Sequence, residues 1–305
     1  MKNIEEQYLD LISTVHSEGD ERSDRTGVGT RSVFGATLRH DMKDGAFPLL
    51  TTKRVYWKTA VREMLWFLTG NTSIRPLLEN GVTIWSEWPH RRYVNETGDD
   101  VTLSDFESMI LEDDDFAREW GDLGPVYGKQ WVDWDTYEPV GDGLFRKGPG
   151  IDQVRRVVED LKTNPTSRRH IIEGWNVAQL DEMALPPCHK SYQFHVSEGR
   201  LNCLLYQRSC DMFLGLPFNL AGQATLTSMI AQQAGLEPGE IVWTGGDVHV
   251  YLNHSEAIEE QLGRTRRSLP RLRLRKAPDI HSYAIDDFEV TGYDPHPSIK
   301  APVAV

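Results

Sequence analysis

The chain has 305 residues, 39% hydrophobic and 26% charged, a composition typical of globular proteins that excludes fibrous and disordered classes. Its net charge of −13 is concentrated at residues 95–122, where eleven acidic residues accompany one basic residue, Arg118, so the remaining chain carries only −3. This distribution excludes the broad positive surface that unspecific nucleic-acid binding requires, but it leaves room for a local basic pocket.

Three cysteines, Cys188, Cys203 and Cys210, form an odd set, and the charged opening segment is followed by no long apolar run. We therefore expect no signal peptide, no membrane span and reduced thiols in the cytoplasm. The length predicts a single domain of residues 1–305 with an acidic insertion at about 89–121.

Hydrophobic spacing predicts the elements in chain order. It indicates an amphipathic helix from Ile4 to near Gly19, a strand at 30–40 and a helix at 56–68 that carries Glu63 among apolar residues. The insertion shows one short helical pattern at 105–120, and we interpret it as a surface segment of low packing value.

The second half is predicted to be richer in strands. A helix fits 151–162, and two β-like runs at 191–196 and 201–208 read as a hairpin. A buried helix is predicted at 221–234, and a strand at 241–243 leads into 245–251. No internal repeat is present.

Cys188 is the candidate nucleophile of the chain, although an unreactive buried thiol is the commoner role of a cysteine. Reactivity requires nearby positive charge, which Arg208 supplies if the hairpin aligns the two residues. His189 is a poor candidate for its base, because neighbouring residues of a strand point to opposite faces.

Cysteine and histidine also raise the possibility of a metal site. None of these residues has the paired short spacing of a structural zinc site, and we expect no metal. The residues considered are Cys188, His189, His195, Cys203, Cys210, His249 and His254.

Four arginines, Arg25, Arg168, Arg169 and Arg208, suit a phosphate dianion, although surface ion pairs are their ordinary role. Three other groups keep structural alternatives open. Glu63 either pairs with a cation or, if buried, shuttles protons; Asn219 either reads a base edge or caps a helix; and Trp85 is either core or ligand platform.

Ordered motifs along nearly the whole chain resemble the thymidylate synthase family, except in the acidic stretch. They are DRTGVGT at 24–30, FPLLTTK at 47–53, LWFL at 65–68, TIW at 83–85, LGPVYGKQW at 123–131, SRR at 167–169, PCH at 187–189, YQRSCD at 206–211, LGLPFN at 214–219, GDVHVYLNH at 246–254 and APVAV at 301–305.

The resemblance implies an α+β fold in which a large mixed sheet is flanked by helices and packs across a dimer interface. It implies methylation of dUMP to dTMP with 5,10-methylenetetrahydrofolate, which leaves as dihydrofolate. Cys188 would add to C6 of uracil, and Glu63 and Tyr127 would handle proton transfers. Arg208, Asn219 and Asp211 complete the catalytic set that the resemblance implies.

The resemblance also assigns binding roles. Phosphate would lie among Arg25, Arg208 and Ser209, with Arg168 and Arg169 contributed by the partner subunit; Asn219 would read uracil, and His249 and Tyr251 would hold the deoxyribose. The full implied substrate set is Arg25, Arg168, Arg169, Gln207, Arg208, Ser209, Asp211, Asn219, His249 and Tyr251, and the folate set is Lys53, Ile84, Trp85, Asp211, Leu214, Gly215, Phe218 and Ala304. Ala304 and Val305 would close as a lid.

Two alternatives remain. A nucleotide hydroxymethylase of the same family would let water quench the intermediate, but Trp85 and the intact tail at 302–305 favour reduction. A catalytically idle nucleotide- or RNA-binding relative would lack a chemical group, whereas Cys188, Glu63, Arg208 and Asn219 are all present. The chain departs from the usual family pattern at 55–56 and at Gly222-Gln223, where a Ser-Tyr pair is common.

Overall fold

The computed structural model describes residues 2–24 and 26–303, which form two compact units. Of the described residues, the first unit comprises 2–24, 26–61, 157–171 and 188–303, and the second comprises 62–156 and 172–187. The boundary between them falls within α2 (Trp57–Thr69), α8 (Gln153–Thr163) and β5 (Ile171–Glu173). None of the described helices combines the length and apolar character that a bilayer crossing requires.

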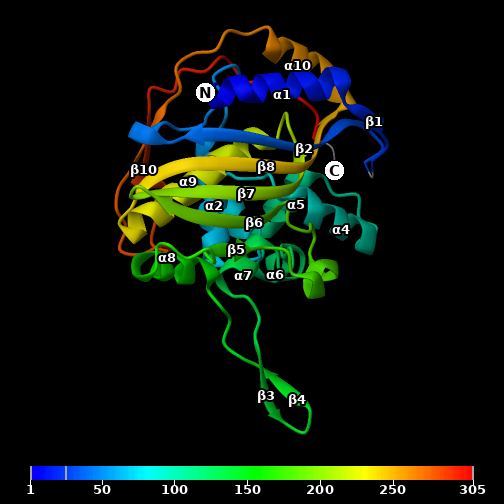
Figure 1. Cartoon of the computed structure of the whole chain (residues 1–305). Coiled ribbons are helices and arrows are strands. Elements are labelled where there is room, and N and C mark those ends of the chain that lie inside the picture. Colours follow the sequence, from blue (N-terminus) through cyan, green and yellow to red (C-terminus); the bar gives the residue numbers. More distant parts are fainter. Residues whose placement is uncertain (1, 25, 304–305) are drawn as a thin grey trace. The chain divides into compact units, whose positions relative to one another are not determined.

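A mixed six-stranded sheet dominates the first unit, with the strand order β1-β2-β8-β7-β6-β5 (Figure 1). Its long strands are β2 (Thr30–Asp41), β6 (His189–Ser197), β7 (Arg200–Asp211) and β8 (Glu237–Tyr251), and β1 (Asp20–Arg22) lies at one edge. β7 and β8 are parallel, whereas β1–β2, β2–β8 and β6–β7 are antiparallel. This arrangement confirms the predicted α+β class.

The parallel pair requires a crossover, which α9 (Leu216–Ala234) provides. Every residue from Leu220 to Ala231 is buried, as the apolar sequence predicted. The helix begins five residues earlier than the expected 221. Asn219 therefore lies inside its first turn, and the cap is Gly215, so the helix-capping interpretation of Asn219 is wrong.

Besides the sheet and α9, the first unit contains an N-terminal helix and several short elements. α1 (Ile4–Glu18) confirms the predicted N-terminal helix, which starts at a capping box formed by Asn3 and Glu6. The other elements are η1 (Lys43–Gly45), η3 (Leu252–His254), α10 (Ser255–Leu262), β9 (Arg271–Leu274), η4 (Ile285–Asp287) and β10 (Phe288–Thr291).

Gln223 is one of the residues at which the chain departs from the usual family pattern. It is fully buried in α9. Its Nε2 donates hydrogen bonds to the carbonyl oxygens of Cys203 and Val242, each at 3.1 Å. Those residues belong to β7 and β8, whose register shifts between Leu201 and Cys203. The amide therefore satisfies two carbonyls beside the irregularity.

Replacing Gln223 by leucine keeps most of the volume but removes both donors. We expect Gln223→Leu to lower the free energy of unfolding by about 1–3 kcal/mol, because buried carbonyls would lose their partner. Urea unfolding followed by circular dichroism measures this change. The matched substitution Gln193→Leu, at an exposed position of β6, should have a much smaller effect; equal losses would contradict the proposed role.

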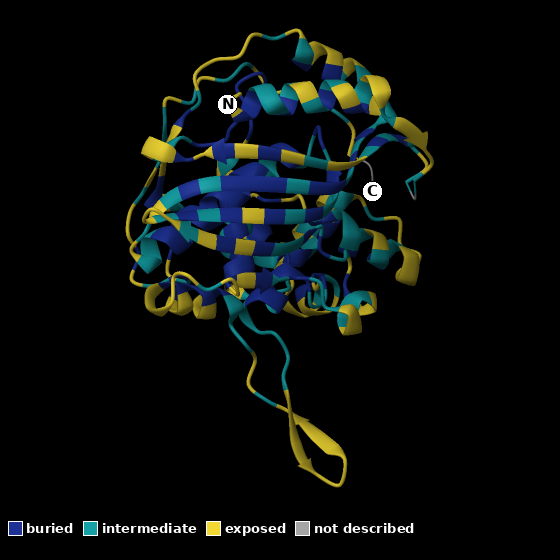
Figure 2. Cartoon of the chain, in the orientation of Figure 1, coloured by how far each residue is buried: buried dark blue, intermediate teal, exposed yellow. Residues whose placement is uncertain are grey.

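The second unit is mainly helical and also carries a protruding hairpin. Its elements are α3 (Arg75–Glu79), α4 (Glu87–Thr97), α5 (Leu103–Glu112), α6 (Asp114–Trp120), α7 (Tyr127–Val132), β3 (Tyr137–Gly141), β4 (Leu144–Lys147) and η2 (Val177–Glu182). Figure 2 shows the β3–β4 hairpin exposed throughout.

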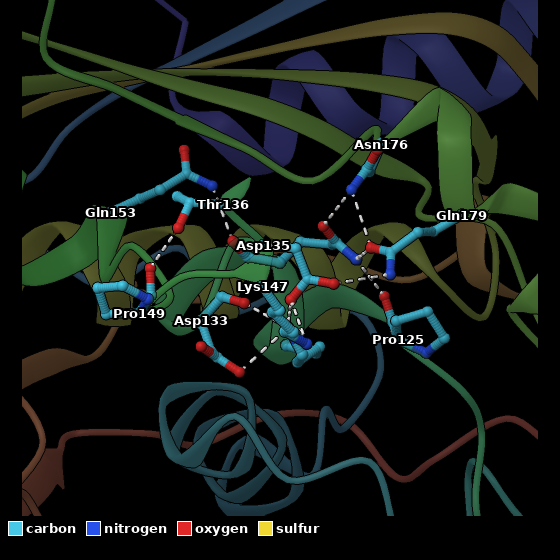
Figure 3. A network of polar contacts seen from close by, with 11 residues as sticks. Pro125, Asp133, Asp135, Thr136, Lys147, Pro149, Gln153, Asn176 and Gln179 are labelled. Atoms are coloured by element: carbon cyan, nitrogen blue, oxygen red, sulfur yellow. Dashed lines mark hydrogen bonds and ion pairs between the residues drawn. The ribbon is translucent and has the colours of Figure 1, made fainter. Parts of the chain in front are cut away.

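A polar network lies at the base of this hairpin (Figure 3). Asp135 pairs with Lys129 and Lys147, each at 2.8 Å, and accepts from Gln179 at 3.3 Å. The hydrogen bond from Lys129 contributes most to lowering the pKa of Asp135, followed by that from Lys147. The network therefore ties the hairpin to α7 and η2 of the same unit.

The acidic insertion packs more extensively than predicted. In place of one short helix it contains α4, α5 and α6, with α6 capped by Asp113, which accepts from the backbone N–H groups of Asp115 and Phe116. Phe106 and Ile110 are fully buried, and the Tyr93 and Trp120 rings lie 5.0 Å apart. The prediction of low packing value is therefore wrong, because scattered aromatic residues form a local core that period analysis does not detect.

Candidate active site

The β6–β7 hairpin places Cys188 beside Arg208. Cys188 immediately precedes β6, and its carbonyl accepts a hydrogen bond of 2.9 Å from the Arg208 backbone N–H. Glu198 and Gly199, with φ of 52° and 73°, form the tight turn that sets this register. The predicted hairpin is confirmed, and the backbones at the nucleophile and its candidate phosphate anchor are hydrogen-bonded.

The three thiols differ in accessibility, and none forms a disulfide. Cys188 is half-buried, whereas Cys203 and Cys210 are buried. Burial raises the pKa of the Cys203 thiol to about 12 and that of Cys210 well above its usual range. Cys188 is therefore the one of the three cysteines that is not buried, which argues against its interpretation as an inert core thiol.

His189 is the buried neighbour of Cys188. Burial lowers its pKa to about 4, against the opposing effect of a hydrogen bond with Asn219. Its Nδ1 also lies 3.0 Å from the Tyr192 hydroxyl. The imidazole is consequently neutral at pH 7 and occupied by structural partners, in agreement with its exclusion as the base for Cys188.

Gln207 and Asn219 are joined by their side-chain amides. Gln207 Nε2 donates to Asn219 Oδ1 at 2.9 Å and to the Ser209 carbonyl at 3.1 Å, and Trp243 Nε1 donates to Gln207 Oε1 at 2.8 Å. Gln207 is buried, while Asn219 is half-buried. The hydrogen bond from Gln207 therefore holds Asn219 Oδ1 in place, while the Asn219 residue remains partly exposed.

His249 and Tyr251 lie on the same side of β8, as their spacing predicted. Residues 247, 249 and 251 are partly exposed while 248 and 250 are buried. His249 Nδ1 lies 2.9 Å from Asp247 Oδ1, and this hydrogen bond is the main cause of the lowered pKa of Asp247. Because Nδ1 donates to the carboxylate, Nε2 of the neutral ring can accept from a hydroxyl.

Asp211 and the first turn of α9 bring a further group of partly exposed candidate residues together. Asp211 Oδ1 accepts from the backbone N–H groups of Phe213 and Leu214 at 2.8 and 3.3 Å. Leu214, Gly215 and Phe218 follow and are all partly exposed. A Cβ on Gly215 would lie 3.6 Å from Asn219 Oδ1 and 3.0 Å from the Asp211 carbonyl oxygen, so a side chain at this position would crowd that carbonyl.

Lys53 is turned inward, which sequence analysis did not predict. Its ammonium donates to the Phe213 carbonyl and lies 3.5 Å from the centroid of that residue's ring. Burial lowers its pKa to about 7, although the charge of Asp211 opposes the shift. The ammonium thus contacts the segment that precedes α9.

Glu63 belongs to the second unit and forms a polar contact inside an aromatic cluster. The Trp85 indole N–H donates to Glu63 Oε1 at 2.7 Å. Glu63 is partly exposed as a whole, but its carboxyl is surrounded by protein, and this burial raises its pKa to about 7 against the effect of that hydrogen bond. The partner is an indole rather than the cation expected of a structural ion pair.

Tyr127 and Trp85 pack in the same cluster. The Tyr127 ring stacks on Phe67 at 4.7 Å and meets Trp85 edge-on at 5.6 Å, and both residues are buried. Ile84, next to Trp85, is 42% exposed and is an uncovered apolar surface of this unit. Trp85 is therefore both a core residue and the hydrogen-bond partner of Glu63.

The arginines and the tail complete the predicted set. Arg208 and Ser209 are partly exposed on β7, and Arg168 and Arg169 are exposed in the loop before β5. Arg25 and Ala304, like Val305, lie outside the described residues. The last described part of the tail is fixed by His254, whose Nε2 lies 2.8 Å from the Pro302 carbonyl oxygen.

Known proteins match this chain over its length. The sequence profile named thymidylate synthase matches residues 6–305. The chain belongs to the thymidylate synthase family. Proteins named thymidylate synthase from Novosphingobium aromaticivorans and Sphingopyxis alaskensis are 64% and 60% identical over 306 residues, which is 100% and 99% of this chain and 98% of each relative. One from Rhizorhabdus wittichii is 57% identical over 99% of the chain.

Sequence reasoning missed two carboxylates that support residues of the candidate site. Asp247 lies two residues before His249, a spacing that could have revealed it. Fully buried Glu5 accepts four hydrogen bonds of 2.6–2.9 Å from the backbone and hydroxyl groups of Thr51 and Thr52, and so fixes the loop before Lys53. No group of acidic, cysteine and histidine side chains suited to a metal ion occurs within 2–24 and 26–303.

Proposed function

We propose that the chain catalyses the reductive methylation of dUMP to dTMP with 5,10-methylenetetrahydrofolate. Membership of the thymidylate synthase family supports the reaction. One observation supports the choice of catalytic residues most strongly. The register of the β6–β7 hairpin joins the backbone of half-buried Cys188 to that of Arg208 by a hydrogen bond.

Cys188 would act through its thiolate. Addition of sulfur to C6 of uracil breaks the C5–C6 double bond and makes C5 nucleophilic, which divides one difficult substitution into easier steps. Arg208 and Ser209 would hold the phosphate and align the ring with the sulfur, because a guanidinium matches phosphate oxygens in geometry and charge. Arg25, Arg168 and Arg169 are further proposed phosphate ligands.

Glu63 would move protons at the pyrimidine. Its pKa of about 7 leaves protonated and ionised forms at similar populations near neutral pH, so one carboxyl can donate a proton in one step and accept it in another. The Trp85 indole holds one oxygen of this carboxyl, and Tyr127 would assist the transfer.

Folate, when bound, supplies the one-carbon unit and the hydride. The residues present fit such a flat ligand, because Leu214, Gly215 and Phe218 are partly exposed next to Asp211, whose Oδ1 is held by backbone donors. Leu214 and Phe218 would pack against its rings and exclude water. Ile84, Trp85, Lys53 and Ala304 are the other proposed folate contacts.

The proposal extends to assembly and location. We assign the active form to a homodimer in which exposed Arg168 and Arg169 complete the partner's phosphate site, with residues 1–305 acting as one catalytic domain. The three thiols outside any disulfide suit a reducing cytoplasm.

Incubation with dUMP and 5,10-methylenetetrahydrofolate tests the reaction directly. The proposal expects dihydrofolate absorbance to rise in step with dTMP. Formation of hydroxymethyl-dUMP without dihydrofolate would instead identify the hydroxymethylase, and binding of dUMP without any turnover would identify an idle relative.

Asn219 is proposed to read the uracil edge by donating to O4 and accepting from N3–H. An aspartate at this position has no donor for O4 but accepts from the cytosine amine. We expect Asn219→Asp to lower kcat/KM for dUMP about 100-fold and to shift preference toward dCMP. Steady-state assays with both nucleotides measure this shift.

Asn202→Asp is the matched control, because Asn202 accepts from the Glu240 backbone N–H through Oδ1, which an aspartate retains. It should leave the preference unchanged. Unaltered discrimination in Asn219→Asp would show that another residue reads the base.

A further inference from the structure

The orientation of the Asn219 side-chain amide determines whether it can pair with uracil or with cytosine. The oxygen and nitrogen of an asparagine amide are nearly equal in size, so its surroundings must decide which atom faces where. A uracil edge needs a donor at position 4 and an acceptor at position 3, whereas a cytosine edge needs the reverse. Asn219 in its flipped orientation would therefore suit cytosine without any change of sequence.

Gln207 is fixed in one orientation by two partners that each act in only one way. The Trp243 indole N–H can only donate and lies 2.8 Å from Gln207 Oε1, while the Ser209 carbonyl can only accept and lies 3.1 Å from Nε2. A flipped Gln207 would oppose donor to donor and acceptor to acceptor. Its orientation therefore follows from its neighbours.

The fixed amide of Gln207 in turn fixes Asn219. Gln207 Nε2 lies 2.9 Å from Asn219 Oδ1, so a flipped Asn219 would place two amino groups against each other. Trp243 is 0% and Gln207 3% exposed, and such a mismatch is most unfavourable where water cannot relieve it. His189 also contacts Asn219, but a neutral imidazole donates or accepts equally well and imposes no direction.

We propose that Trp243 and Gln207 are positioning residues that hold the Asn219 amide in one orientation and thereby set the preference for uracil over cytosine. The inference rests on the proposed function, since it takes Asn219 as the group that meets the base. Trp243 acts through Gln207 and needs no contact with the nucleotide.

Equilibrium binding of dUMP and dCMP to purified variants tests this relay. Trp243→Phe removes the indole N–H, and we expect the ratio of dUMP to dCMP affinity to fall about tenfold. Gln207→Glu keeps an acceptor for Trp243 but turns an acceptor toward Asn219, which should flip and present Oδ1 to the base. The ratio should then fall about 100-fold, even if Trp243→Phe does not fold.

A double substitution separates positioning from a merely structural role. The two oxygens of a carboxylate are equivalent, so Trp243→Phe in an Asn219→Asp background should leave the ratio unchanged. Trp66→Phe removes a different indole donor, which binds the Ser73 carbonyl, and should also leave the ratio unchanged.

The outcomes separate the relay from the proposed function. Equal losses of dUMP and dCMP affinity in Trp243→Phe and Gln207→Glu would overturn the relay, while Asn219→Asp would still show whether Asn219 reads the base. Failure of the unaltered protein to bind dUMP would contradict the proposed function itself.

Discussion

Cys188→Ser is expected to abolish turnover, by about 10⁴-fold or more, while dUMP binding stays measurable. Serine has nearly the same shape, so the hairpin and its hydrogen bond to Arg208 should persist. Its hydroxyl ionises at far higher pH than a thiol and is a much weaker nucleophile toward C6 without a base. Dihydrofolate absorbance measures turnover, and calorimetric titration with dUMP measures binding.

Cys203→Ala provides the control for loss of a thiol elsewhere. Cys203 is buried and its pKa is about 12, so this variant should keep most of its activity. A Cys188→Ser enzyme with a rate near that of the unaltered protein would refute the sulfur mechanism.

Glu63→Gln should lower kcat by about 10²–10⁴, the usual contribution of a positioned proton donor or acceptor. Glutamine preserves an acceptor for the Trp85 indole but cannot exchange a proton. Because the carboxyl is protonated below its pKa of about 7 and ionised above it, the unaltered enzyme should show an inflection near pH 7 in log kcat/KM. The inflection should be absent from the residual activity of the variant.

The same substitution has a predictable effect on stability. The pKa of the Glu63 carboxyl is about 4.5 in the unfolded chain and about 7 in the folded protein, because burial disfavours the ionised form. Its contribution to the free energy of unfolding therefore falls as the pH rises from about 4.5 to 7. We therefore compare the free energy of unfolding of Glu63→Gln with that of the unaltered protein at two pH values. The difference should favour the variant more at pH 8 than at pH 5. Exposed Glu79→Gln should change neither profile, and retention of the pH 7 inflection in Glu63→Gln would assign it to another group.

Strongly patterned elements were predictable from sequence. α1, the β6–β7 hairpin and the buried part of α9 follow from hydrophobic spacing and turn residues, because these local patterns agree with their tertiary surroundings. The pairing of Cys188 with Arg208 followed from the hairpin alone. Motif resemblance supplied the remaining candidate residues without their geometry.

Other features depend on contacts between distant residues. The core of the acidic insertion brings Tyr93 and Trp120 together across 27 positions, which no local period reveals. The role of Gln223 depends on a register shift between β7 and β8, and the inward turn of Lys53 on the position of Phe213. The orientation of Asn219 likewise requires Trp243, which is 24 residues away along the chain.

Mass spectrometry after incubation with 5-fluoro-dUMP and 5,10-methylenetetrahydrofolate tests the central claim most directly. Fluorine at C5 cannot leave as a cation, so the covalent adduct should persist. We predict an intact mass increased by the nucleotide and the folate, with the modification on the peptide that contains Cys188. An adduct on another residue, or an unmodified protein that nevertheless converts dUMP to dTMP, would contradict the account.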